Sequence, residues 1–122
     1  MGRLKRHTIS FKHAFDGLFY TLKSQPNFQV HIFLAIVAII AGIVLHLASS
    51  EWNIIIFVIG LVLISEMINT SIESIVDLVT DKYHFKAKIA KDVAAGMVLV
   101  SAIIAVATGI MIFLPHLITL YL

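Results

Sequence analysis

Residues 52–77 read WNIIIFVIGLVLISEMINTSIESIVD, an apolar run that is long enough to cross a membrane and that ends among acids. A helix of roughly 20 residues spans the ~30 Å hydrocarbon core of a bilayer. Glu66, Asn69, Glu73 and Asp77 are spaced by three, four and four residues, which places them on one face of a helix. An acid inside a bilayer costs at least ~2.5 kcal/mol on insertion scales, so this polar face predicts a functional site.

The composition of the rest of the chain is also that of a membrane protein. Of 122 residues, 60% are hydrophobic and 13% are charged, and the absence of cysteine excludes disulfides and thiolate metal sites. We expect one all-α membrane domain with an N-terminal amphipathic surface helix and three transmembrane spans. The expected segments are the surface helix at 1–25, spans at 30–47, 52–72 and 93–114, and a polar loop at 80–91.

Basic residues are confined to two segments of the chain. Five lysines and arginines precede the first span and four lysines lie in the 80–91 loop, whereas residues 48–51 and 115–122 have none. The positive-inside rule therefore predicts a cytoplasmic N-terminus and loop, with the C-terminus outside. At ~1.5 Å per residue, Glu66 lies about 21 Å from Trp52, the expected anchor at the outer interface. The polar face is thus predicted to open toward the cytosol.

The segment 66–77 resembles the signature helix of the small bacterial membrane lipid kinases, which are the prokaryotic diacylglycerol kinases and their Gram-positive relatives, the undecaprenol kinases. The family pattern is Glu-x-x-Asn-[Ser/Thr]-Ala-Ile-Glu-x-x-x-Asp, and this chain departs from it at Ser71. A second block, Tyr83-His84 followed by Ala90-Lys91-Asp92, also resembles the family and stands at the right distance from the first. The resemblance covers essentially the whole chain. It implies a homotrimeric, ATP- and Mg²⁺-dependent kinase of the bacterial cell membrane, with active sites shared between protomers.

The resemblance also implies roles for individual residues. Glu66 matches the catalytic base of the family, and Glu73 matches a metal-binding glutamate that shares Mg²⁺ with position 25. Lys91 matches a phosphate-binding lysine, and Asp92 a neighbouring residue of the nucleotide site. Further nucleotide contacts are expected from Asn69, Asp77, Lys82, Tyr83, His84, Lys86 and Arg6, and lipid contacts from Glu66, Asn27, Phe28 and His31.

Position 25 departs from the family, which has a glutamate where this chain has Gln25. A glutamine still offers a carbonyl oxygen, but it removes one negative charge from the metal shell. Pro26 also biases the residue before it away from helical geometry. Weaker magnesium binding, an adjusted site and an inactivated variant are the three interpretations, and we favour an active enzyme with a weaker metal shell.

Two function classes remain open at this point. Within the kinase class, undecaprenol is the expected substrate, because residues 27–31 and 112–115 resemble the Gram-positive branch, and diacylglycerol is the alternative. The second class is a small oligomeric transporter or channel subunit that uses Glu66. That hypothesis does not explain Glu73, Asp77 and a lysine-rich loop at the same membrane face. Glu66 and Asn69 could also simply join spans through interhelical hydrogen bonds. No P-loop is present, and no nucleic-acid partner is expected.

Overall fold

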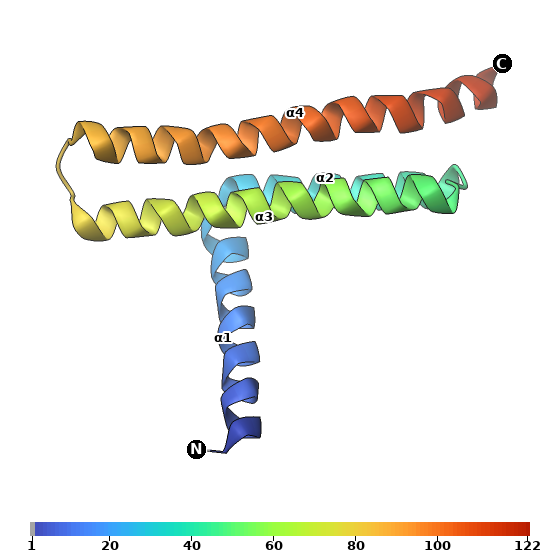
Figure 1. The fold of residues 1–122 in the computed structure, drawn as a ribbon. Coiled ribbons are helices and arrows are strands. Elements are labelled where there is room, and N and C mark those ends of the chain that lie inside the picture. The colour runs from blue at the N-terminus through green and yellow to red at the C-terminus, as the bar shows by residue number, and fades with distance from the viewer. Residues whose placement is uncertain (1) are drawn as a thin grey trace.

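The computed structural model describes residues 2–122, and this part of the chain is helical, with no strand. The four helices are α1 (Arg3–Ser24), α2 (Pro26–Val44), α3 (Ser49–Val79) and α4 (Phe85–Tyr121). Helices α2, α3 and α4 lie alongside one another, while α1 points away from them crosswise (Figure 1). Three of the helices, α2, α3 and α4, are long and apolar enough to cross a membrane. The all-α membrane fold expected from the sequence is confirmed.

The break between α1 and α2 is caused by a proline. Gln25 has an extended backbone (φ −111°, ψ 105°), and Pro26 occupies the first turn of α2. Proline has no N–H to donate and its ring crowds the preceding residue, so a new helix begins where the old one cannot continue. Across the break, Gln29 Nε2 donates to the carbonyl oxygen of Leu22 at 2.8 Å, which fixes the direction in which α1 leaves α2.

A tight turn joins α2 to α3, and we call this end of the bundle the turn end. His46 adopts a left-handed conformation (φ 55°), and the N–H of Leu47 donates to the carbonyl oxygen of Gly42. The indole ring of Trp52 packs directly on Gly42. Glu51 accepts a hydrogen bond from the N–H of Ala48 at 2.8 Å and thereby caps the first turn of α3.

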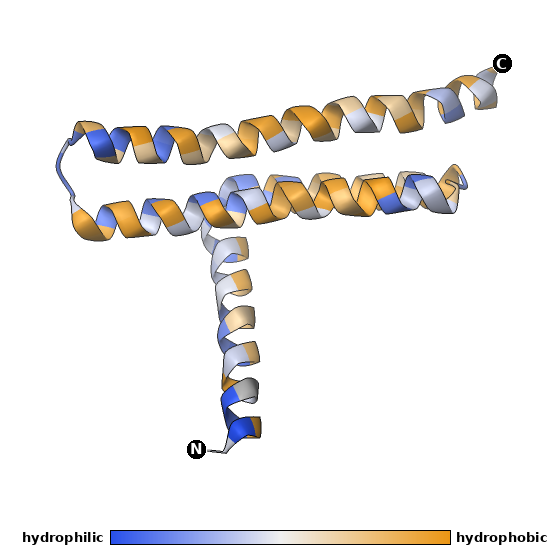
Figure 2. Cartoon of the chain, viewed as in Figure 1, coloured by the Kyte–Doolittle hydropathy of each residue, from blue (hydrophilic) through white to orange (hydrophobic). Residues whose placement is uncertain are grey.

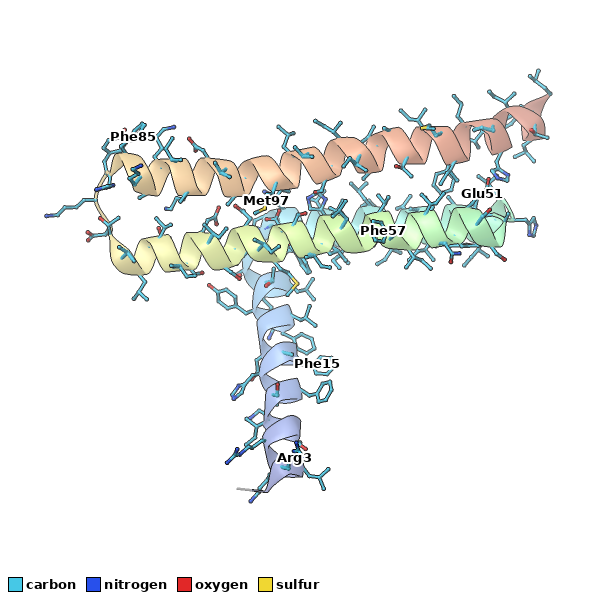
Figure 3. All side chains as sticks on the ribbon, viewed as in Figure 1. Arg3, Phe15, Glu51, Phe57, Phe85 and Met97 are labelled. Atoms are coloured by element: carbon cyan, nitrogen blue, oxygen red, sulfur yellow. The ribbon has the colours of Figure 1, made fainter. Side chains whose placement is uncertain are left out.

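Helices α3 and α4 form an antiparallel pair with a constant register. Glu51 contacts His116 at the turn end, Ile55 and Ile112 share a buried cluster, and Asp77 contacts Lys91 at the other end, which we call the loop end. The two residue numbers in each pair add up to 167 or 168, so the register does not slip along the helices. Figure 3 shows Glu51 at the turn end beside the last turns of α4.

The structure corrects several of the expected boundaries. The polar loop is limited to residues 80–84, and α4 already begins at Phe85, so the lysines at 86, 88 and 91 are helical. The reason is a helix cap: His84 Nδ1 accepts the N–H of Lys86 at 3.1 Å. The helix that contains the third span continues through Pro115 to Tyr121, because one missing N–H does not break a helix whose other bonds persist. The helix that contains the first span begins at Pro26, four residues before the expected start of the span, and ends at Val44.

Helix α3 is longer than the hydrocarbon core of a bilayer and extends past the start of α2 at the loop end. Helix α2 has 19 residues and is ~28 Å long, close to the ~30 Å core, whereas α3 has 31 residues and is ~46 Å long. The contact between Gly42 and Trp52 and the antiparallel direction bring Pro26 level with about residue 68. Glu66 therefore lies within the span, and Glu73 and Asp77 lie beyond the first residue of α2. Hydrophilic residues gather at this end (Figure 2).

Candidate functional site at the loop end

The polar face predicted on α3 is real and its deepest part is buried. Glu66 is 1% exposed and Asn69 is 6% exposed, and Ser65 and Thr70 beside them are buried as well. The two hydroxyls are used within the helix, since Ser65 donates to the carbonyl oxygen of Leu61 and Thr70 to that of Glu66. The acid and the amide are therefore the groups of this face that remain for chemistry.

Two buried acceptor atoms on this face have no hydrogen-bond partner in the described chain. Asn69 Nδ2 donates to Glu73 Oε1 at 3.2 Å, but Asn69 Oδ1 and Glu66 Oε2 are enclosed and unpaired. Leaving a buried polar group unsatisfied costs ~1–3 kcal/mol, more for a charged one. Either acceptor could take a hydrogen bond from a hydroxyl group. His31 on α2 and Glu73 are the ionisable groups that act electrostatically on Glu66.

At the outer end of this face, an ion pair ties α3 to α4. Lys91 Nζ lies 2.6 Å from Asp77 Oδ1, and this hydrogen bond raises the pKa of Lys91 above its ordinary value. The lysine is thus held as a cation at the mouth of the site. On α4 itself, Lys88 pairs with Asp92 one turn away. Lys91 and Asp92 are therefore each paired with a side chain of opposite charge, Lys91 with Asp77 and Asp92 with Lys88.

The loop end contains a polar pocket of about 290 Å³. Six of the residues predicted to bind nucleotide line it, namely Asp77, Lys82, Tyr83, His84, Lys91 and Asp92. Three others lie elsewhere: Asn69 is deeper on α3, Lys86 is exposed on the first turn of α4, and Arg6 is exposed on α1. Arg6 lies in the first turn of α1. This helix projects away from the bundle (Figure 1).

A second cavity, of about 250 Å³, is apolar and lies between α2, α3 and α4. His31 lines it together with aliphatic side chains and small residues, among them Ala102, Ala105 and Gly109. Sequence analysis missed this cavity; the small residues of α4 were its only signal. Of the other predicted lipid contacts, Phe28 is buried and Asn27 is exposed at the start of α2.

The proposed metal residues fit Mg²⁺ chemistry in part. Glu73 is half-buried and carries a carboxylate, and Mg²⁺ is usually held by one or two carboxylates together with phosphate oxygens. Within residues 2–122 no group of three histidine, aspartate or glutamate side chains converges on one point. Gln25 lies at the break between α1 and α2, and its side-chain amide donates to the neighbouring Ser24 Oγ at 3.4 Å.

Three helices long and apolar enough to cross a membrane, with a buried acid and a polar pocket at one end, are the features of a multi-pass membrane protein. A family model described as "Prokaryotic diacylglycerol kinase" matches residues 12–113. The chain therefore belongs to the prokaryotic diacylglycerol kinase family and is a membrane lipid kinase.

Named relatives agree with this assignment. An undecaprenol kinase of Bacillus subtilis is 46% identical over 114 residues, which are 93% of this chain and 93% of the relative. A diacylglycerol kinase of Synechocystis is 43% identical over 113 residues, 92% of this chain but 65% of the relative. A diacylglycerol kinase of Helicobacter pylori is 34% identical over 100 residues, 76% of this chain and 78% of the relative. Because all three are named as kinases, the transporter or channel hypothesis receives no support.

Proposed function

We propose that this chain transfers the γ-phosphate of ATP to the hydroxyl of undecaprenol, with Glu66 as the general base. The observation that carries the proposal is the buried carboxylate of Glu66, whose Oε2 is enclosed and unpaired on the face that leads to the polar pocket. A lipid hydroxyl is a poor nucleophile and needs a proton acceptor within hydrogen-bond reach. Glu66 is an acid at the depth where the hydroxyl of a bilayer-embedded alcohol would lie.

The proposed reaction is an in-line phosphoryl transfer. Glu66 accepts the hydroxyl proton while the lipid oxygen forms a bond to the γ-phosphorus, and the bond from that phosphorus to the bridging β–γ oxygen breaks to release ADP. Lys91 and Lys82, which are cations of the polar pocket, would hold the phosphates. Glu73 and Gln25 would hold Mg²⁺, which when bound neutralises charge on the phosphate oxygens. Asn69 fixes Glu73 through its 3.2 Å hydrogen bond.

Undecaprenol is the preferred acceptor on the strength of the Bacillus relative, which is matched along nearly its whole length. A prenyl chain is apolar, and the apolar cavity beside His31 is open to such a chain. Diacylglycerol is the second candidate, because the Synechocystis and Helicobacter relatives carry that name. Both lipids present a primary hydroxyl, so the chemistry at Glu66 is the same.

The proposal includes an orientation and an assembly. The positive-inside rule favours a cytoplasmic loop end, where ATP is available, and a turn end outside the cell membrane. A homotrimer with shared sites would bring α1 of one protomer over the polar pocket of the next. The projection of α1 away from its own bundle supports this arrangement, since Arg6 lies on that helix (Figure 1).

The test is transfer of labelled γ-phosphate from ATP by the purified protein in lipid nanodiscs. Undecaprenol and diacylglycerol are offered separately at matched mole fractions, with magnesium titrated in each case. We expect kcat/KM to be at least ~10-fold higher for undecaprenol, a difference of about 1.4 kcal/mol in transition-state binding. Equal or faster transfer to diacylglycerol would overturn the substrate assignment, and no transfer to either lipid would overturn the proposed reaction.

A further inference from the structure

Ser101 is a buried polar residue of α4 that the proposed reaction does not use. It is 3% exposed, and its Oγ donates to the carbonyl oxygen of Val98, three residues earlier, at 2.8 Å. That carbonyl belongs to the interior of α4, where the helical N–H of Ala102 is its regular partner. The serine hydroxyl can therefore turn away from Val98 without leaving a buried acceptor unpaired.

The register of α3 against α4 places Ser101 opposite Glu66. The pairs Glu51 with His116 and Ile55 with Ile112 lie toward the turn end, and Asp77 with Lys91 lies toward the loop end. The residue numbers of these pairs add up to 167 or 168, and those of Glu66 and Ser101 add up to 167. Both side chains are almost fully enclosed, as expected of residues that face each other across a helix pair.

The carboxylate of Glu66 lacks the donor that Ser101 can supply. Glu66 Oε2 is enclosed and has no partner in the described chain. On its own helix, Asn69 Nδ2 already donates to Glu73, and Thr70 Oγ1 donates to the main-chain oxygen of Glu66. From α2, His31 acts on Glu66 electrostatically, with no hydrogen bond recorded between them. A hydroxyl that faces Glu66 from α4 would be a further neutral donor, available to the unpaired Oε2.

We propose that Ser101 is a positioning residue for Glu66: its hydroxyl donates to Glu66 Oε2 and fixes the carboxylate so that the other oxygen meets the lipid hydroxyl. This inference rests on the proposed function of Glu66 as the base. A hydroxyl donor stabilises a buried carboxylate and selects one of its rotamers. A base held in the productive orientation accepts the proton more readily. Its positioning therefore raises kcat and leaves substrate affinity unchanged.

The experiment compares four variants in nanodiscs: Ser101→Ala, Ser101→Thr, Ser65→Ala and Glu66→Gln. Ser65 is the matched control, because it is a buried serine next to Glu66 whose hydroxyl donates to the main chain. We expect Ser101→Ala to lower kcat about 10-fold or more, with KM for ATP and lipid unchanged within about twofold. Ser101→Thr, which keeps the hydroxyl, should recover most of kcat, and Ser65→Ala should match the wild type.

An infrared measurement tests the hydrogen bond without relying on turnover. The difference spectrum between the wild type and Glu66→Gln isolates the carboxyl band of Glu66. We expect Ser101→Ala to shift that band, and Ser65→Ala to leave it in place. An unshifted band together with wild-type kcat in Ser101→Ala would overturn the inference, as would an equal loss of kcat in Ser65→Ala. Turnover retained by Glu66→Gln would instead refute the proposed base, while the band shift would still report the contact.

Discussion

Glu66 is the innermost residue of the polar face on α3, and in our proposal it is also the catalytic base. It lies on a helix that is long and apolar enough to cross a membrane, and its spacing from Asn69 and Glu73 continues the polar face toward the loop end. The face changes in character along its length. Glu66 is enclosed, Glu73 is half-buried and hydrogen-bonded to Asn69, and Asp77 is exposed and paired with Lys91. In the proposed reaction, the lipid hydroxyl would meet the inner end of this face and the nucleotide its outer end.

At Glu73 we predict an effect on magnesium. Glu73→Gln should raise the magnesium concentration for half-maximal activity by at least ~10-fold, because a neutral amide replaces a carboxylate ligand. A magnesium titration of lipid phosphorylation measures this. Glu51→Gln serves as the control, since it removes the same charge at the opposite end of the bundle. An unchanged magnesium midpoint in Glu73→Gln would remove this residue from the metal site.

At Gln25, the same magnesium titration should show tighter binding instead of weaker binding. Gln25→Glu restores a negative charge at the break between α1 and α2, so it should lower the magnesium midpoint if this residue reaches the metal. No change in the midpoint would place position 25 outside the metal shell. That result would agree with the contact of its amide with Ser24.

At the scale of the helices, the turn end depends on one close contact. A Cβ atom added to Gly42 would lie 2.7 Å from Cη2 and 2.9 Å from Cζ2 of Trp52, and the rigid indole cannot bend away. We predict that Gly42→Ala lowers the free energy of unfolding in detergent by ~1–3 kcal/mol, the usual cost of overpacking. Gly60→Ala is the matched control, because no atom lies within 4 Å of its added Cβ. Equal stability of the two variants would contradict the contact.

The other contact at the turn end is sensitive to acid. The N–H of Ala48 and the imidazole of His116 lower the pKa of Glu51 below 4.5, and His116 Nε2 lies 3.0 Å from Glu51 Oε2. A carboxyl group whose pKa is lower in the folded state stabilises the fold above its unfolded pKa and loses that effect as the pH falls through the folded value. Glu51 lies in the first turn of α3, just before the apolar segment that starts at Trp52.

We therefore predict that thermal stability falls below about pH 4.5 by more in the wild type than in Glu51→Gln, which cannot titrate at this position. The difference between the two melting curves is followed from pH 7 downward in detergent. His46, which lies in the adjoining turn, remains present in both proteins. Parallel pH dependence of the two melting temperatures would show that Glu51 contributes nothing to the joint between α3 and α4.

The number and order of the helices could be predicted from the sequence, whereas the residues at which they begin and end could not. Apolar runs and lysine positions sufficed for four helices, but His84 extended α4 into the expected loop through a cap that composition does not reveal. The α3 polar face followed from spacing alone. The apolar cavity and the level of Ser101 could not be predicted, since both depend on the register between α3 and α4, which is a tertiary property. The contact between Glu51 and His116, 65 residues apart, was missed for the same reason.

For the whole molecule, orientation is the property on which the chemistry depends. The chain has no cysteine, so single cysteines report accessibility without background. We predict that Ser50→Cys in the first turn of α3 reacts with a membrane-impermeant maleimide added to intact cells. Asp81→Cys in the 80–84 segment should react only after the membrane is opened. The reverse labelling pattern would place the polar pocket outside the cell, where ATP is scarce, and would contradict the proposed reaction.

The most direct test of the proposed chemistry is phosphoryl transfer by Glu66→Gln. The variant keeps the shape of the side chain but cannot accept the hydroxyl proton, so we predict a loss of turnover of ~10²–10⁴-fold. ATP affinity, measured by equilibrium binding to the same nanodiscs, should stay within about twofold, because the polar pocket at the loop end is separate from this buried position. Turnover within a few-fold of the wild type would contradict Glu66 as the base.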